Sequence, residues 1–267
     1  MQVKMRKVER KMDYKYFTVE VKDKTAWITY DKPPINAMNA DAYREMAALF
    51  GNMGENKKIR CIVLKSAGKG FIGGNDINEI AGHTKQNHAE YQKIVGSAIT
   101  AIESCDIPII AMVHGYAIGS GMLVAMACDI VYADDTAWFT LPEVKLGIIA
   151  GMSFAMNDIP KKVLYHMCLT GGKVTAEQML QYGAVNVVTI PEELEERTAR
   201  AAEQITSQPP HTVRVFKQCT RMWYNNRSAE KFDMETIFTH EILETKEKEE
   251  CVKAFFEKRP AVFSDEW

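Results

Sequence analysis

The sequence predicts an α/β fold with largely parallel strands, followed by a helical C-terminal region. The first observation is the alternation of short apolar, β-branched runs with amphipathic segments through the first two thirds of the chain. The second is a mostly helical pattern from about Ile159 onward. The third is a composition of 46% apolar and 25% charged residues over 267 positions, which is ordinary for a globular protein with a sizeable core.

These patterns divide the chain into three parts. Residues 1–12 are basic and polar without an apolar stretch, which does not fit a secretory signal. We expect a disordered lead there, or an upstream start preceding a natural one at Met12. Residues 13–200 form the predicted α/β core, and residues 201–267 form the predicted helical region.

The core begins with a predicted β-hairpin. Residues 17–21 and 25–30 are β-rich runs joined by a short charged segment. Asn39 or Asp41 then caps a helix that runs through about Asn52, with apolar residues recurring on one face. Further strand-length apolar runs lie at 61–65, 107–113, 130–133 and 137–139.

Polar and apolar helical patterns separate these strands. Residues 79–88 are more polar and predict a mobile loop, in which His83 and His88 are expected to be solvated. A helix follows to about Ser104, and an apolar helix after Gly121 runs to about residue 128. Later, Thr175 and Gln178 have the spacing of a capping box at another helix start.

Charge and cysteine usage exclude several classes of protein. A net charge of −2 offers no electrostatic case for nucleic acid or an anionic membrane. No apolar run reaches the length of a membrane span. The six cysteines are scattered without a CxxC pair, so we expect reduced core thiols of a cytoplasmic protein and no metal site.

Two short glycine turns carry the chemistry that the sequence suggests. Gly73-Gly74-Asn75-Asp76 and Gly119-Ser120-Gly121 each follow a segment predicted to be a buried strand. Each turn could present a bare backbone N–H, and two such donors aimed at one carbonyl oxygen form an oxyanion hole. Glu143 follows the second turn and could move a proton at the carbon next to that carbonyl.

Each turn also has a purely structural interpretation. The first could be an ordinary strand-to-helix turn, with Asp76 capping a helix that begins at Ile77. The second could serve only close helix–strand packing. The second turn is neither a phosphate loop nor a dinucleotide fingerprint, because GxxxxGK[ST] and GxGxxG are both absent from it.

Taken together, five segments resemble the crotonase (enoyl-CoA hydratase/isomerase) superfamily, and they occur in the expected order from about Tyr14 onward. They are residues 70–77, 115–121, 128–133, 139–147 and 254–259. The resemblance implies a crotonase-like ββα spiral core with a helical C-terminal trimerisation region. It also implies an acyl-CoA thioester as substrate, with coenzyme A as part of that substrate and not a separate cofactor. Assembly as a homotrimer, commonly paired into a hexamer, is implied as well.

The resemblance assigns roles residue by residue. The N–H groups of Gly73 and Ser120 would form the oxyanion hole, although Ser120 stands where the family usually has glycine. Glu143 matches a family catalytic glutamate. The remaining matches line coenzyme A: Gly73, Gly74, Asn75, Asp76, Ile77, Phe255 and Lys258, the last two often contributed by a neighbouring subunit. For the Asn75 side chain we favour a turn-stabilising role over a contact with coenzyme A or substrate.

Leu123 departs from the two-acid hydratases of the family. Those enzymes carry a second glutamate at this place to position the attacking water, which a leucine cannot do. The site is therefore more similar to Δ3,Δ2-enoyl-CoA isomerases, which shuttle a proton with one glutamate. A hydratase, and behind it a decarboxylase or thioester hydrolase, stay open as alternatives. A non-enzymatic binding protein is disfavoured because Glu143 is kept beside both turns.

Overall fold

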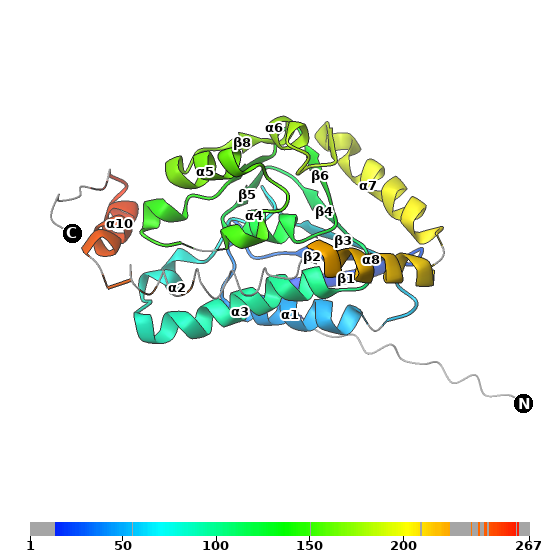
Figure 1. Cartoon of the computed structure of the whole chain (residues 1–267), viewed down its shortest axis with the longest axis horizontal. Coiled ribbons are helices and arrows are strands. Elements are labelled where there is room, and N and C mark those ends of the chain that lie inside the picture. The colour runs from blue at the N-terminus through cyan, green and yellow to red at the C-terminus, as the bar shows by residue number, and fades with distance from the viewer. Residues whose placement is uncertain are drawn as a thin grey trace, which may run out of the picture.

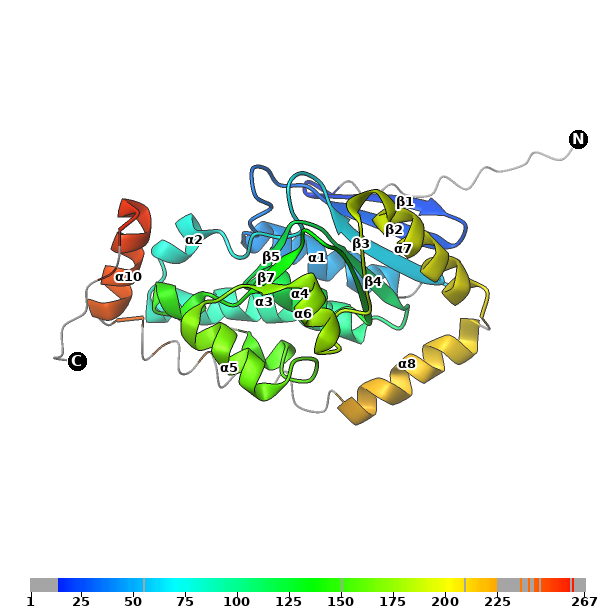
Figure 2. The same ribbon diagram turned by 90° about the horizontal axis from the view of Figure 1, so that it is seen from above.

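The computed structural model describes residues 14–54, 56–149, 151–208, 210–224, 236, 240, 243–244, 246–259 and 261. The predicted lead at residues 1–12 lies outside them, as does much of the predicted C-terminal region. Figures 1 and 2 give two views of the chain.

A six-stranded sheet forms the centre of the described structure. Its strands lie in the order β1 (Phe17–Lys22), β2 (Thr25–Tyr30), β3 (Cys61–Ser66), β4 (Ile109–Val113), β6 (Ile130–Asp134) and β9 (Val187–Thr189). The β1–β2 hairpin is antiparallel, and every other neighbouring pair in this sheet is parallel. The predicted hairpin and the largely parallel pairing are thus confirmed.

A smaller three-stranded sheet lies beside the first, in the order β5 (Tyr116–Ile118), β7 (Trp138–Thr140) and β8 (Val174–Thr175). β5 and β7 are parallel, whereas β8 is antiparallel to β7. The helix α4 (Ser120–Met126) begins directly after β5, and all of its residues are buried. The second glycine turn therefore joins this smaller sheet to a buried helix.

The other helices cover these sheets. They are α1 (Ala40–Met53), α2 (Ile77–Ala81), α3 (Lys85–Ser104), α5 (Lys161–Thr170), α6 (Ala176–Gln181), α7 (Pro191–Thr206), α8 (Pro210–Tyr224) and α10 (Lys246–Glu257). Two short 3₁₀ helices, η1 (Glu143–Leu146) and η2 (Met152–Phe154), follow β7. Figure 1 shows α1 and α3 side by side along one side of the molecule, with α10 at one end beyond α2.

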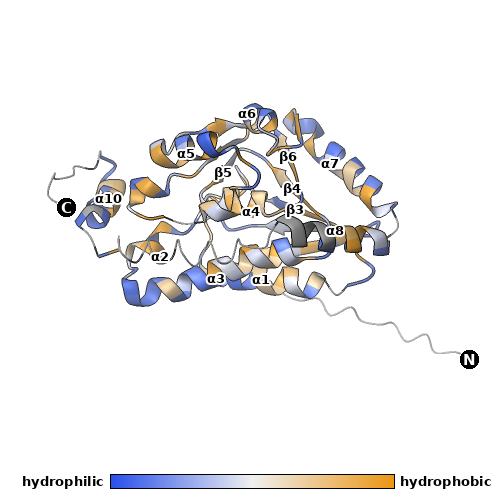
Figure 3. Cartoon of the chain, in the orientation of Figure 1, coloured by the Kyte–Doolittle hydropathy of each residue, from blue (hydrophilic) through white to orange (hydrophobic). Residues whose placement is uncertain are grey.

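The central sheet buries both of its faces. Successive side chains of a strand point to opposite faces, so β3 contributes Ile62 and Leu64 to the large core that includes α1 and α3. Its alternate residues Cys61 and Val63 pack with Leu194 of α7 in a second cluster. In Figure 3 the strands are mostly hydrophobic, whereas the outer helices carry both colours. A parallel sheet covered on both faces is the arrangement that βα alternation produces.

The predicted first helix is confirmed as α1. Its N-cap is Asn39, whose side chain accepts a hydrogen bond from Ala42 N at 3.0 Å. Tyr43, Met46 and Phe50 recur at helical spacing and are fully buried. This buried stripe packs α1 against α3 and the sheet, and it gives Tyr43 its place beneath both glycine turns.

The segment predicted as a mobile loop is largely helical, and its two histidines are buried. α3 begins at Lys85 behind Thr84, whose side chain takes part in a capping box with Asn87. His83 and His88 are 9% and 1% exposed, and their Nδ1 atoms lie 3.2 Å apart. His88 Nε2 also lies 2.9 Å from Gln92 Nε2. The prediction of solvated histidines is wrong because α3 buries a polar stripe and the histidines hydrogen-bond there.

The second half of the chain contains strands that its helical pattern did not predict. β8 belongs to the smaller sheet and β9 to the central sheet, and both lie within the stretch predicted as mostly helical. The boundary predicted near residue 200 falls inside α7, which packs on the central sheet. Farther along, α8 is attached to the core through Lys217, whose ammonium lies 2.6 Å from Asp129 Oδ2.

Two expectations about membrane spans and cysteines can be compared with the described residues. Among them, no helix has both the length and the apolar character needed to cross a membrane. The described cysteine side chains, at positions 61, 105, 128, 168 and 251, are free thiols, and four of the five are buried.

Candidate active site

The first glycine turn lies between two strand-like neighbours. Ile72 forms a parallel bridge with Ala117 of β5 on one side. On the other side Met38 uses both of its backbone groups: its N–H donates to Gly74 O at 2.8 Å, and its carbonyl accepts from Asp76 N at 2.8 Å. The extended segment that precedes α1 therefore sets the course of the turn.

This pairing decides which backbone N–H of the first turn is available to a ligand. In a parallel bridge the residue opposite Met38, which is Asn75, directs its own N–H and C=O away from Met38. Within the described part of the chain the Asn75 N–H has no hydrogen-bond partner. The Gly73 N–H, by contrast, donates to Asn36 O at 3.3 Å. The Gly73 amide, predicted as an oxyanion donor, is therefore already used, whereas the Asn75 amide is available to a ligand.

Position 73 requires glycine for a steric reason. A β-carbon there would overlap the carbonyl oxygen of Ile35, so the residue must be small to let two backbone segments approach. Gly74 takes a positive φ of 90°, which only glycine adopts readily. Asn36 is itself buried, and its side-chain amide donates to the carbonyl oxygens of Ala67 and Gly70 at 2.6 and 3.0 Å.

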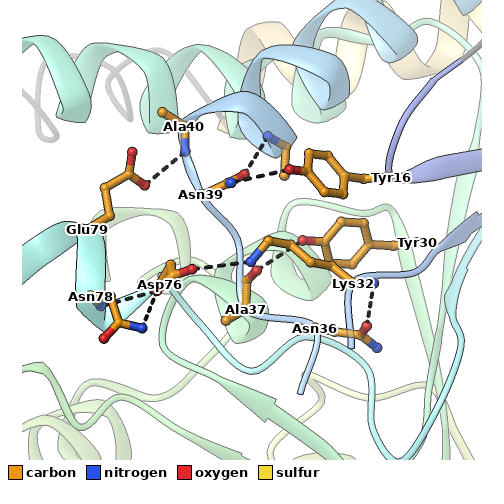
Figure 4. A network of polar contacts seen from close by, with 11 residues as sticks. Tyr16, Tyr30, Lys32, Asn36, Ala37, Asn39, Ala40, Asp76, Asn78 and Glu79 are labelled. Atoms are coloured by element: carbon orange, nitrogen blue, oxygen red, sulfur yellow. Dashed lines mark hydrogen bonds and ion pairs between the residues drawn. The ribbon is translucent and has the colours of Figure 1, made fainter. Parts of the chain in front are cut away.

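Polar contacts anchor the end of the first turn, as Figure 4 shows. Asp76 caps α2 by accepting from Asn78 N at 3.1 Å, which confirms the predicted helix start at Ile77. The same carboxylate lies 3.2 Å from Lys32 Nζ. Glu79 of α2 accepts from Ala40 N at 3.0 Å, at the start of α1. The first turn is thereby tied to the segment between β2 and α1.

The second glycine turn combines tight packing with a helix start. Gly119 has φ of 53° and ψ of −122°, and its N–H donates to Thr140 O at 2.8 Å. A β-carbon at Gly121 would overlap the backbone of Ile72, which confirms close packing of α4 on the first turn. Ser120 begins α4, so its N–H has no acceptor within the helix. The packing interpretation therefore holds for this turn, and the helix start leaves the Ser120 N–H available to a ligand.

Tyr43 joins the two turns. Its fully buried hydroxyl lies 2.5 Å from Asn75 Oδ1 and 2.6 Å from Ser120 Oγ. The sequence pattern predicts Tyr43 only as part of an apolar helix face. The missed signal is general: a tyrosine on the buried face of a helix needs a hydrogen-bond partner for its hydroxyl. The predicted turn-stabilising role of the Asn75 side chain agrees with this contact.

Glu143 lies directly against the second turn. It begins η1 after β7, and a β-carbon at Gly119 would be 2.5 Å from Glu143 Oε1. Burial raises the pKa of Tyr43 far above its ordinary value, the Ser120 hydrogen bond lowers it, and the Glu143 charge raises it further. The carboxylate is thus close enough to act electrostatically on the phenol that bonds both turns.

The surroundings of Glu143 and α4 are largely apolar. Leu123 and Leu141 are each 2% exposed, and Leu123 packs so closely on Gly151 that a β-carbon there would overlap it. Ser120 is also 2% exposed, whereas Asn75 and Glu143 are half-buried. The site therefore has an apolar wall at Leu123 and two half-buried polar residues that solvent reaches.

Two predicted coenzyme A contacts lie elsewhere in the chain. Phe255 is 48% exposed on α10, where its ring contacts Phe256. Lys258 follows the helix at a positive φ of 53° and is exposed. Figure 2 shows α10 at one end of the molecule, away from the β5–α4 junction. The structure brings together Asn75, Ser120 and Glu143, whereas Phe255 and Lys258 are exposed on or just after α10, a helix that packs against η1.

The chain matches a known enzyme family over nearly its whole length. The family model described as enoyl-CoA hydratase/isomerase matches residues 20–266. The short-chain-enoyl-CoA hydratase of Clostridium acetobutylicum is 31% identical over 258 residues, which cover 93% of this chain and 97% of that protein. The (E)-benzylidenesuccinyl-CoA hydratase of Thauera aromatica is 30% identical over 251 residues, covering 92% and 98%.

A solved structure of an enoyl-CoA hydratase/isomerase from Pseudoalteromonas atlantica T6c agrees with these matches. It superposes with a TM-score of 0.84 at 26% identity, covering 94% of this chain and 100% of that chain. The chain belongs to the enoyl-CoA hydratase/isomerase family, and it is an enzyme of that type. The crotonase-like fold that the sequence implied is confirmed.

Proposed function

We propose that this protein shifts the double bond of an enoyl-CoA thioester through an enolate, with Glu143 as the single base. The thioester oxygen would accept hydrogen bonds from the N–H groups of Asn75 and Ser120. Each such donor contributes about 3–4 kcal/mol to transition-state stabilisation in comparable oxyanion holes. The family match supports an acyl-CoA substrate, because the curated relatives are named as CoA-thioester enzymes.

The proton movement balances without any other reactant. Glu143 takes a proton from C2 of a 3-enoyl-CoA, and the electrons pass into the thioester carbonyl as a dienolate. The oxyanion donors hold the charge on oxygen. Glu143 then returns the proton to C4, the double bond moves to C2=C3, and the carboxylate is regenerated.

One observation carries the choice of an isomerase. The Glu143 carboxylate lies against Gly119, whereas the first turn of α4 presents the buried Leu123 and no acid. A proton shuttle needs one base, but hydration also needs a group that orients water. Leu123 cannot orient water, so the arrangement favours the shuttle.

The remaining roles belong to the same proposal. Residues 73–77 would form the wall along which coenzyme A lies, and Phe255 and Lys258 would reach coenzyme A of a neighbouring subunit. Their exposure on α10 is compatible with a contact between chains. A cytoplasmic homotrimer, or a hexamer built from two, completes the expectation.

Hydration is the second candidate because both curated relatives quoted above are named hydratases. A panel of enoyl-CoA thioesters in deuterated water separates the two reactions by mass spectrometry. Deuterium at C2 or C4 without added water identifies the isomerase. Net gain of water would instead establish the hydratase and overturn the proposed shuttle.

Glu143→Gln tests the role of the base. We expect the rate of 3-enoyl-CoA isomerisation to fall by about 10²–10⁴-fold, the usual contribution of a general acid–base group. Coenzyme A thioester binding, measured by calorimetry, should persist because the oxyanion donors remain. The matched control is Glu177→Gln, an exposed carboxylate in the first turn of α6, which should leave turnover unchanged. Full turnover by Glu143→Gln would remove Glu143 from the mechanism.

A further inference from the structure

A single buried phenol connects the two backbone donors of the proposed oxyanion hole. Tyr43 Oη lies 2.5 Å from Asn75 Oδ1 and 2.6 Å from Ser120 Oγ, and the side chain is fully buried. Asn75 and Ser120 are also the residues of the two turns whose N–H groups lack a backbone acceptor among the described residues. The side chains of both donor residues therefore share one partner, although they lie on separate turns.

The protons in this contact can be assigned by counting donors. A carboxamide oxygen only accepts hydrogen bonds, so the single phenol proton belongs to the bond with Asn75 Oδ1. The bond to Ser120 must then run the other way, with the serine hydroxyl donating to Tyr43 Oη. The result is a directed chain from Ser120 through Tyr43 to Asn75, in which each bond polarises the next.

The backbone at the start of α1 and the Tyr91 ring hold Tyr43 in place. Tyr43 N donates to Asn39 O at 3.1 Å within the first turn of α1, and Met38, one residue earlier, pairs with the backbone on both sides of Asn75. The Tyr43 ring also meets Tyr91 of α3 edge to face, with centroids 6.3 Å apart. The backbone at Tyr43 is thus held by pairing, and its ring is held by burial and by packing against α3.

The phenol does not act as an acid or base at neutral pH. Burial raises the pKa of Tyr43, and the nearby Glu143 charge raises it further. Tyr43 stays protonated and neutral over the working range of such an enzyme, so it acts through the two residues it contacts. Serine at position 120 supplies the hydroxyl that this contact requires, where glycine would leave the phenol oxygen without a donor.

We infer that Tyr43 is a positioning residue that holds the Asn75 and Ser120 amides at the spacing of an oxyanion hole. The inference rests on the proposed function, and it adds a reason for Ser120 in place of glycine. An oxyanion hole is fully used only when charge develops on the thioester oxygen. Loosening it should therefore lower kcat much more than it raises KM.

Tyr43→Phe removes the phenol oxygen while keeping the ring. We expect kcat to fall about 10-fold to 100-fold, as for a small displacement of catalytic groups, with KM within about threefold. Tyr91→Phe is the matched control, since the Tyr91 hydroxyl is buried without a hydrogen-bond partner among the described residues. That variant should keep the wild-type kcat.

The rate at which the C2 protons of butanoyl-CoA exchange in deuterated water should fall in Tyr43→Phe and should keep its wild-type value in Tyr91→Phe. This exchange reports enolate formation whichever final reaction the enzyme performs. Thermal melting of each variant separates loss of folding from loss of geometry.

A double-mutant cycle with Ser120→Gly tests whether Tyr43 acts through the serine. In wild type, Ser120→Gly should lower kcat by a factor similar to that of Tyr43→Phe, and glycine keeps the backbone N–H. In the Tyr43→Phe background the same change should cost less than about threefold, because the contact is already lost. Ser120→Gly also keeps the test decisive if Tyr43→Phe fails to fold.

Three outcomes would overturn the inference while leaving the proposed function intact. They are a Tyr43→Phe enzyme as fast as Tyr91→Phe, a change confined to KM, and losses that simply multiply in the double variant. A wild-type protein that neither exchanges nor turns over any acyl-CoA would instead show that the proposed function has failed, and the positioning role with it.

Discussion

The two glycine turns each leave one N–H without a backbone acceptor among the described residues, yet they are built differently. The first is an extended segment whose course is set by pairing with Met38 on one side and β5 on the other. The second is a sharp bend at Gly119 that leads directly into the buried helix α4. In the first, the donor amide is available because of strand register. In the second, it is available because the first N–H groups of any helix lack acceptors.

This difference determines how each turn depends on distant residues. Asn75 faces the site only because Met38, far away in sequence, bonds to the backbone atoms on either side of it. Ser120 faces the site because of its own local helix start. The first turn should therefore respond to changes in its neighbours, and the second to changes in its own glycines.

Gly121→Ala should produce the largest effect on stability. The added β-carbon would overlap the carbonyl of Ile72, and backbone atoms on both sides leave no simple way to relax. We expect a loss of about 3 kcal/mol in the free energy of unfolding, at the upper end of overpacking costs. Urea unfolding followed by circular dichroism measures it.

The control is Gly51→Ala in α1, where no atom lies within 4 Å of a new β-carbon. It should raise stability by about 0.5–1 kcal/mol, because alanine is the better helix former. If the two variants were equally stable, the close contact of α4 with the first turn would be contradicted.

Gly119→Ala should have a smaller effect on stability but a large one on catalysis. The backbone at φ of 53° is strained for alanine by about 1–3 kcal/mol. Its β-carbon would also lie 2.5 Å from Glu143 Oε1 and displace the carboxylate. We expect kcat to fall about 100-fold, as for a displacement of about 1 Å.

Gly68→Ala separates these two effects. Gly68 also has a positive φ, of 81°, but no atom lies within 4 Å of a β-carbon there. Gly68→Ala should lose about as much stability as Gly119→Ala. Its kcat, measured by steady-state kinetics, should be unchanged. An active Gly119→Ala enzyme would show that Glu143 does not need its place against this turn.

A change of pH should give the smallest effect on the free energy of unfolding, and it should act through His88 of α3. Burial lowers the pKa of His88 to about 3, and the neighbouring His83, His240 and Lys248 charges add to this. The unfolded chain takes up this proton near pH 6.5, whereas the folded protein does not until far lower pH. Stability is therefore complete above pH 6.5 and is lost as the pH falls below it, by up to about 1.4 kcal/mol per pH unit.

His88→Gln should flatten this dependence between pH 6 and pH 5, where the wild type is expected to lose about 1 kcal/mol. The new side chain would meet Gln92, His83 and His240. The control is His166→Gln on the exposed face of α5, which should leave the slope as it was. Parallel slopes for wild type and His88→Gln would remove His88 as the source of acid sensitivity.

Sequence patterns predicted most of the central architecture. Strand-length apolar runs with a hairpin at the start marked β1 to β4, because β-branched and apolar runs bounded by polar turns have few other solutions. The same periodicity missed β9, whose short run of valines lies in a stretch that otherwise has a helical pattern. It also misjudged His83 and His88, since polar residues at helical spacing do not reveal that they satisfy one another when buried.

The candidate site was predicted as a pair of turns and an acid, but not as particular donors. Two consecutive glycines marked the first turn, and the resemblance named Gly73 as the donor. Which amide is available depends on the Met38 pairing, and the structure gives that place to Asn75. Tyr43 was missed for a similar reason: helix periodicity predicts that it is buried, not what its hydroxyl meets.

The sequence by itself determined the family, the two glycine turns, the single acid and the leucine of the helix after the second turn, because these depend on residue identity and short spacing. Tertiary structure alone decided which N–H faces the site, which buried hydroxyl joins the two turns, and which histidines are protected from water. Those features depend on strand register and on contacts between residues far apart in the chain. A one-residue change of register opposite Met38 would redirect the Asn75 N–H without changing a single amino acid.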